Sequence, residues 1–135
     1  MTTPHVEHHI QLLEHLRTIL VAVADAEVVP ENHHALFIER FDDMVARLRE
    51  STEDLYMGQD IISQVFQRYP QIAHLVPRDL LWFFGGDCLH FMPDEEIDKF
   101  QILEERRFEA LEKGEDFNWA QELQLMFMPE DTPKQ

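Results

Sequence analysis

A short segment near the middle of the chain gathers residue types that can do covalent chemistry. Cys88 is the only cysteine, and Asp87 and His90 lie beside it. A histidine can take the proton of a nearby thiol and leave the reactive thiolate, so such a pair can act as a nucleophile. Residues two apart in an extended turn face the same side. One hypothesis is therefore an enzyme that uses Cys88 and His90.

The alternative for this segment is structural. A cysteine among aromatic residues is most often a small buried hydrophobe, and the sequence shows no oxyanion donors and no orienting acid beyond Asp87. We therefore predict no catalytic residues and favour a protein that is not an enzyme. The same corner is the candidate ligand-binding site. Its predicted residues are Trp82, Asp87, Cys88 and His90.

The histidines are the second group that can do chemistry. Four of the eight lie in the first predicted helix: His5, His8, His9 and His15. His5 and His9 are four residues apart, which places them on one helix face, where two imidazoles can hold zinc or nickel. Only Glu7 and Glu14 are near enough in sequence to act as a third ligand. We therefore predict no metal site and no cofactor.

Apolar periodicity defines the helices that must position these groups. The residues His9, Leu13, Leu16, Leu20 and Val23 recur at spacings of three and four, which predicts a helix from His5 to about Ala26. From Phe37 to Tyr69 the same alternation continues without a slip and forms a heptad-like seam. A single helix over 31–69 would protrude from a domain of this size and require a partner chain.

The other interpretation of the seam is two helices. Ser51-Thr52-Glu53-Asp54 resembles a helix N-cap followed by an acid, and helices average only about 11–12 residues. We favour a break near Ser51. Self-association as a homodimer, through the seam or through the final helix, is the predicted oligomeric state.

The most apolar helix lies at the centre of the predicted fold. Residues 78–84 are apolar on nearly all sides, which is typical of a helix buried in a core. Gly85-Gly86 ends this helix, and Pro93 opens the next one. No stretch shows the alternation of a β-strand. We predict an all-α fold, an irregular bundle of five or six helices around residues 78–84. A single helical domain should span 1–128, with a flexible tail at 129–135.

Charge and composition exclude several classes of function. The 135 residues include 11 lysines and arginines against 27 acids, a net charge of −16. Nucleic acids and anionic membranes attract basic surfaces, so neither is an expected partner. No apolar run reaches the roughly 18 residues of a membrane span. A lone cysteine and an N-terminus without signal-peptide features indicate a cytoplasmic protein.

The central segment also resembles a known family. The run Trp82–Ile97 (WFFGGDCLHFMPDEEI), followed by Phe100-Gln101 and Glu104–Phe108, is similar to a family of small uncharacterised proteobacterial proteins. The resemblance implies a match over the whole chain and a bacterial setting, and it assigns no catalytic residues. The leading functional prediction is a non-enzymatic protein-interaction or regulatory module. The alternatives are a helical protein that binds a small ligand or a metal, and an enzyme that uses Cys88 and His90.

Overall fold

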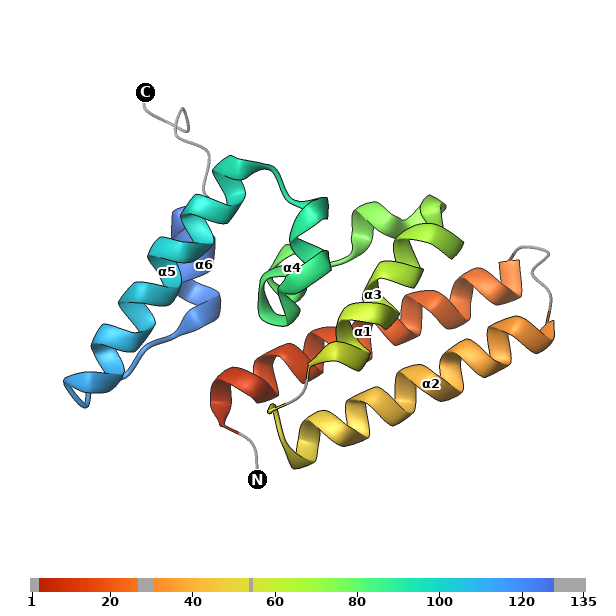
Figure 1. Ribbon diagram of the computed structural model, residues 1–135, viewed down its shortest axis with the longest axis horizontal. Coiled ribbons are helices and arrows are strands. Elements are labelled where there is room, and N and C mark those ends of the chain that lie inside the picture. Colours follow the sequence, from red (N-terminus) through yellow and green to blue (C-terminus); the bar gives the residue numbers. More distant parts are fainter. Residues whose placement is uncertain (1–2, 27–30, 54, 128–135) are drawn as a thin grey trace. The chain divides into compact units, whose positions relative to one another are not determined.

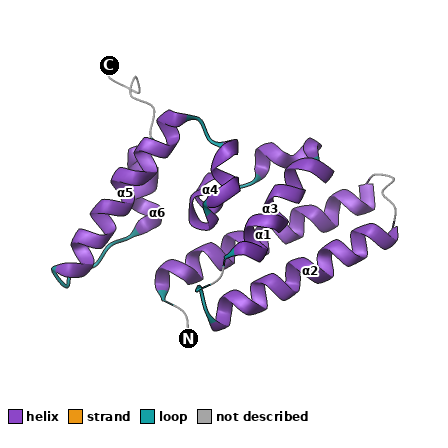
Figure 2. Cartoon of the chain, viewed as in Figure 1, coloured by secondary structure: helices purple, strands orange, loops and turns teal. Residues whose placement is uncertain are grey.

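The computed structural model describes residues 3–26, 31–53 and 55–127, and these residues form helices joined by short loops, with no strand among them (Figure 2). The described part contains six α-helices and two 3₁₀-helices. They are α1 (Pro4–Ala26), α2 (Glu31–Glu50), α3 (Tyr56–Arg68), η1 (Pro70–Leu75), α4 (Arg78–Phe84), η2 (Gly86–Phe91), α5 (Asp94–Glu112) and α6 (Trp119–Met126). The all-α prediction is confirmed. The predicted number of five or six helices was wrong, because two short connections are wound as 3₁₀-helices.

The chain divides into two compact units, Met1–Phe91 and Met92–Gln135. The first unit contains α1 to α4 with both 3₁₀-helices, and the second contains α5 and α6. A single domain over 1–128 stays a prediction. The tail predicted at 129–135 lies outside the described residues.

In the first unit, α1 and α2 lie side by side and run in opposite directions (Figure 1). The predicted face of α1 is confirmed, since its apolar side chains are buried against those of α2. The buried residues of the two helices include Ile10, Leu13, Leu16, Leu20, Phe37, Phe41, Met44 and Leu48. Each buried side chain of this size contributes roughly 1.5–3 kcal/mol. The exposed Arg17–Asp42 ion pair, at 2.7 Å, contributes about 1 kcal/mol at most. Apolar burial therefore dominates this packing.

The heptad-like seam is broken between α2 and α3, as we favoured. α2 ends at Glu50 and α3 begins at Tyr56. Between them, the Oγ of Ser51 accepts a hydrogen bond from the backbone N–H of Glu53 at 3.1 Å. Ser51 does not cap α3, which begins only at Tyr56. The seam residues are buried on both sides of the break, from Phe37 to Tyr69. Their apolar side chains pack within the unit instead of forming one long exposed stripe.

The short helix α4 packs against α1 and α3 in the same unit. Its residues Leu80, Leu81 and Phe84 are buried, as expected for a core helix. The side chain of Gln59, on α3, donates a hydrogen bond to the backbone oxygen of Phe84 at 2.9 Å. Gly85 follows with a φ of 64° and ends the helix, a conformation that glycine adopts without steric cost. Its buried face and its C-terminal end therefore position α4.

In the second unit, α5 packs against α6. Asn118 caps α6, because its side-chain oxygen accepts a hydrogen bond from the backbone N–H of Gln121 at 3.0 Å. On α5, Phe100 and Leu103 are buried. Phe108 and Leu111 are exposed, whereas Ala110 is buried. Across the described helices of both units, none is long and apolar enough to cross a membrane.

The contact between Gly58 and Phe84 generates a stability prediction. A Cβ atom at Gly58 would overlap the ring of Phe84. Overpacking of this kind destabilises a fold by about 3 kcal/mol. The higher helix propensity of alanine relative to glycine stabilises the helix by about 1 kcal/mol. Gly58→Ala should therefore lower the free energy of unfolding by about 2 kcal/mol, measured by urea denaturation. The double variant Gly58→Ala/Phe84→Leu should recover part of the loss; a wild-type stability for Gly58→Ala alone would contradict the predicted overlap.

Candidate metal centre

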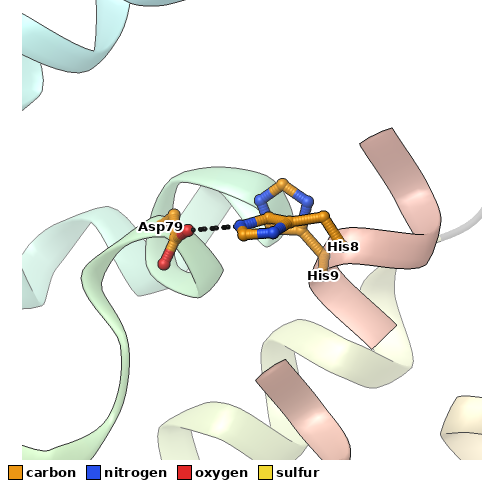
Figure 3. Close-up of side chains that lie close together, drawn as sticks. All are labelled: His8, His9 and Asp79. Carbon is orange, nitrogen blue, oxygen red and sulfur yellow. Dashed lines mark hydrogen bonds and ion pairs between the residues drawn. The ribbon is translucent and has the colours of Figure 1, made fainter. Parts of the chain in front are cut away.

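Three side chains from two helices of the first unit meet at one point (Figure 3). His8 and His9 come from the first third of α1, and Asp79 comes from the first turn of α4. One possible ligand atom from each lies within 4.8 Å of the other two. The dashed line in Figure 3 joins the Nε2 atom of His8 to the Oδ2 atom of Asp79 at 3.0 Å. Two nitrogen donors and one oxygen donor therefore converge.

The helical period of α1 explains the positions of the two histidines. His9 is in register with Leu13, Leu16 and Leu20, so its side chain points into the core and is 0% exposed. His8 is one residue earlier, about 100° round the helix, at the edge of the buried face. Its side chain is 26% exposed. One imidazole is therefore held inside the unit and the other reaches the surface.

Asp79 is the polar residue on the buried side of α4. It is 5% exposed, and a carboxylate at that depth is tolerated only with polar partners. His8 supplies one such partner. The first turn of a helix also favours negative charge, because unpaired backbone N–H groups point towards it. The packing of α1 against α4 thus brings the carboxylate to the histidines.

A backbone hydrogen bond determines the tautomer of His9. Its Nδ1 atom lies 2.8 Å from the backbone oxygen of His5. A carbonyl oxygen can only accept, so Nδ1 bears the hydrogen and Nε2 is the ring nitrogen with the lone pair. Histidines that bind metals usually donate their other ring N–H to a carbonyl or carboxylate in this way.

Burial determines the charge of His9. The pKa of His9 is lowered to about 4, mainly by loss of hydration and also by the charges of His5 and His8, while the hydrogen bond to the His5 backbone and the charge of Asp79 act in the opposite direction. The ring is therefore neutral at pH 7, which is the form that coordinates metal ions.

Aromatic packing fixes the orientation of the same ring. Phe83, on α4, stacks on His9 with 4.4 Å between ring centroids and 14° between planes. The ring of His5 lies edge-on to His9 at 4.6 Å. A ligand ring held on both sides loses little rotational freedom when it binds an ion, which favours binding.

The geometry suits an ion with four ligands at short distances. Two ligands of a tetrahedral zinc ion, each about 2.0–2.1 Å from the metal, are about 3.3 Å apart. His8 Nε2 and Asp79 Oδ2 lie 3.0 Å apart, and all three ligand atoms lie within 4.8 Å of one another, so the side chains would have to adjust their separations for all three to reach one ion. Imidazole and carboxylate together are typical ligands of zinc and its first-row neighbours.

The predicted ligand site at residues 82–90 is arranged differently. Cys88 is fully buried, and its Sγ lies 3.7 Å from the backbone oxygen of Gln59, to which the thiol donates. Asp87 and His90 are exposed, and Trp82 is half-buried. A buried thiol and two exposed polar side chains do not form one cluster, so the structure does not bring these four residues together. That they bind a ligand stays a hypothesis.

The chemistry of Cys88 also disfavours a nucleophile. Burial raises the pKa of the Cys88 thiol to about 11, a hydrogen bond with Ser63 lowers it, and the charge of Asp87 raises it. The thiol is therefore protonated at neutral pH, and the thiolate is the reactive form.

The metal hypothesis from sequence paired His5 with His9 and offered Glu7 or Glu14 as a third ligand, whereas the structure groups His9 with His8 and Asp79. His5 and His9 do lie near each other, but the cluster pairs His9 with His8 and takes its carboxylate from 71 residues away. One signal was present in the sequence. His9 lies on an apolar face and Asp79 lies in an apolar helix, and polar residues at buried positions require partners.

Comparison with known protein families matches residues 1–135 to the PA2817-like family. The chain belongs to the PA2817-like family. That family is uncharacterised, as the resemblance of the central segment implied, so membership supplies no activity and no site residues. No curated protein and no solved structure matches the chain. The site must therefore be argued from its own geometry.

Burial of Cys88 generates a reactivity prediction. The native protein at pH 7.5 should show almost no alkylation by iodoacetamide over the time in which the unfolded protein reacts completely, because the thiol is buried and protonated. Intact-mass spectrometry would measure the extent of alkylation of the native protein and, in 6 M guanidinium, of the unfolded protein. Rapid alkylation of the native protein would contradict this and would favour the Cys88–His90 enzyme hypothesis.

The pKa of His9 generates a stability prediction. Because this pKa is about 4 in the folded protein and 6.5 in the reference state, the unfolded chain takes up a proton that the folded chain excludes. Stability is then complete above pH 6.5 and falls as the pH drops towards 4, by up to roughly 3 kcal/mol.

Urea denaturation between pH 7.5 and 4.5, with a chelator present, would measure this slope. His9→Gln should flatten the profile, whereas His15→Gln, at an exposed position of the same helix, should leave it unchanged. An unchanged profile in His9→Gln would assign the acid sensitivity to other groups.

Proposed function

We propose that this protein binds one divalent transition-metal ion of the zinc class at His8, His9 and Asp79. The observation that carries the proposal is the convergence of these three donor groups within 4.8 Å, two of them buried. This makes a helical metal-binding protein the best-supported of our functional hypotheses. It replaces the sequence-based expectation of no metal and no cofactor.

The donor set favours some metals over others. Two imidazoles and one carboxylate suit zinc, cobalt, nickel and copper, whereas magnesium and calcium prefer oxygen ligands. Copper binds such sites most tightly by intrinsic affinity, so selectivity in a cell depends on which metal is available. The neutral, oriented His9 ring supports the same class, because its lone pair needs no deprotonation before it binds.

The leading prediction from sequence, a protein-interaction module, stays a hypothesis with a smaller structural basis. The seam on α2 and α3 that suggested a homodimer has its apolar residues buried within the first unit. Exposed apolar side chains that a partner or a second copy could cover include Phe108 and Leu111 on α5 and Leu125 on α6. Native mass spectrometry would give the oligomeric state and any bound metal in one measurement. Cytoplasmic location and bacterial origin likewise stay predictions.

The metal proposal is tested by titration of the full-length protein with Zn²⁺. Isothermal titration calorimetry should show one ion per chain. Loss of a residue that only hydrogen-bonds to a ligand weakens metal binding by roughly 10–100-fold. Larger losses are expected for His8→Gln, Asp79→Asn and His9→Gln, because each of these variants removes a direct ligand.

Matched controls are His15→Gln on the same helix and Asp87→Asn, an exposed carboxylate near the other candidate site. Both should bind Zn²⁺ with wild-type affinity. Circular dichroism would show that each variant is folded, and His8→Gln, at the surface edge of the cluster, is the variant least disruptive to the core. Wild-type affinity in a folded His8→Gln protein, or weak binding that all variants share, would overturn the proposal.

A further inference from the structure

We infer that the ion at this centre keeps one coordination position open on the surface side of His8, and that this position takes a small monoanion such as a carboxylate. The inference rests on the proposed metal site and names the ligand that the site would present to solution. It follows from the number of ligands, from their unequal burial and from the charge that they leave uncompensated.

Three protein side chains can act as ligands at this centre. Among the described residues, only His8, His9 and Asp79 group together there. Zinc takes four ligands, and sites with three protein ligands hold a water or an exogenous molecule in the fourth position. His5 is the nearest further imidazole, in edge contact with His9, but it is not a member of the cluster.

The unequal burial of the three ligands indicates where the fourth coordination position of the ion lies. His9 is 0% exposed and Asp79 is 5% exposed. The ring of Phe83 covers one face of His9 at 4.4 Å. The side chain of His8, by contrast, is 26% exposed. The core side of the ion is therefore occupied by protein, and the remaining position lies towards solvent beside His8.

Charge selects the class of ligand. A divalent ion held by one carboxylate and two neutral imidazoles keeps about one uncompensated positive charge. Part of the site is buried, so this charge is weakly screened and attracts an anion. The chain as a whole has a net charge of −16, which repels polyanions such as nucleotides. A small anion with a single charge satisfies both conditions.

Cobalt provides a spectroscopic test on the full-length protein. Co²⁺ should bind in place of zinc and give a visible absorption band whose position and intensity report the ligands of the ion. Azide and acetate are the probes, and sulfate, a weakly chelating divalent anion, is the control for charge. Azide and acetate should shift the band and saturate at one anion per cobalt, whereas sulfate at equal concentration should have a much smaller effect.

Two results separate failure of this inference from failure of the metal proposal. If no visible band forms with Co²⁺ and no Zn²⁺ binds, the metal site itself is absent. If the band forms but neither azide nor acetate changes it, the ion is present and its fourth position is closed, which overturns the inference.

The variant His5→Gln identifies the alternative fourth ligand. The backbone oxygen of residue 5, which holds His9, remains in this variant. With an open position in the wild type, His5→Gln should respond to azide as the wild type does. A response to azide that appears only in His5→Gln would assign the fourth position to His5 and overturn the open site.

Discussion

The buried carboxylate of Asp79 is the constraint on which much of the first unit depends. A charged group that loses its hydration must be compensated inside the protein, and His8 lies 3.0 Å away to do so. That contact can form only if the start of α4 lies against the first third of α1. The same packing stacks Phe83 on His9. One electrostatic requirement thus fixes the register of two helices that are distant in sequence.

The helix that contributes Asp79 is too short to be stable alone. Isolated helices under about 12–15 residues are marginal in water, and α4 has 7 residues. It is held at its carboxyl end by the hydrogen bond from Gln59 and by the ring of Phe84 against Gly58. The position of the carboxylate therefore depends on α3 as well as on α1, so the candidate site rests on the packing of three helices.

Local pattern predicted most of the helices, and it could not predict which of them meet. The spacing of His9 with Leu13 and Leu16 correctly predicted that the His9 side chain is buried. Periodicity reports which face of a helix is apolar, but not what covers it. The carboxylate was missed for that reason, because Asp79 reaches the histidines only through the contact of α4 with α1.

The distance in sequence between the proposed ligands has a consequence for synthesis. His8 and His9 leave the ribosome before Asp79, which follows 71 residues after His8. The nascent chain thus offers two imidazoles long before the carboxylate exists, and an ion bound by the histidines alone is held weakly. For the proposed site, residual affinity of the unfolded chain would make the stabilisation of the folded protein smaller than the full free energy of metal binding. Completion of the ligand set coincides with the packing of α4.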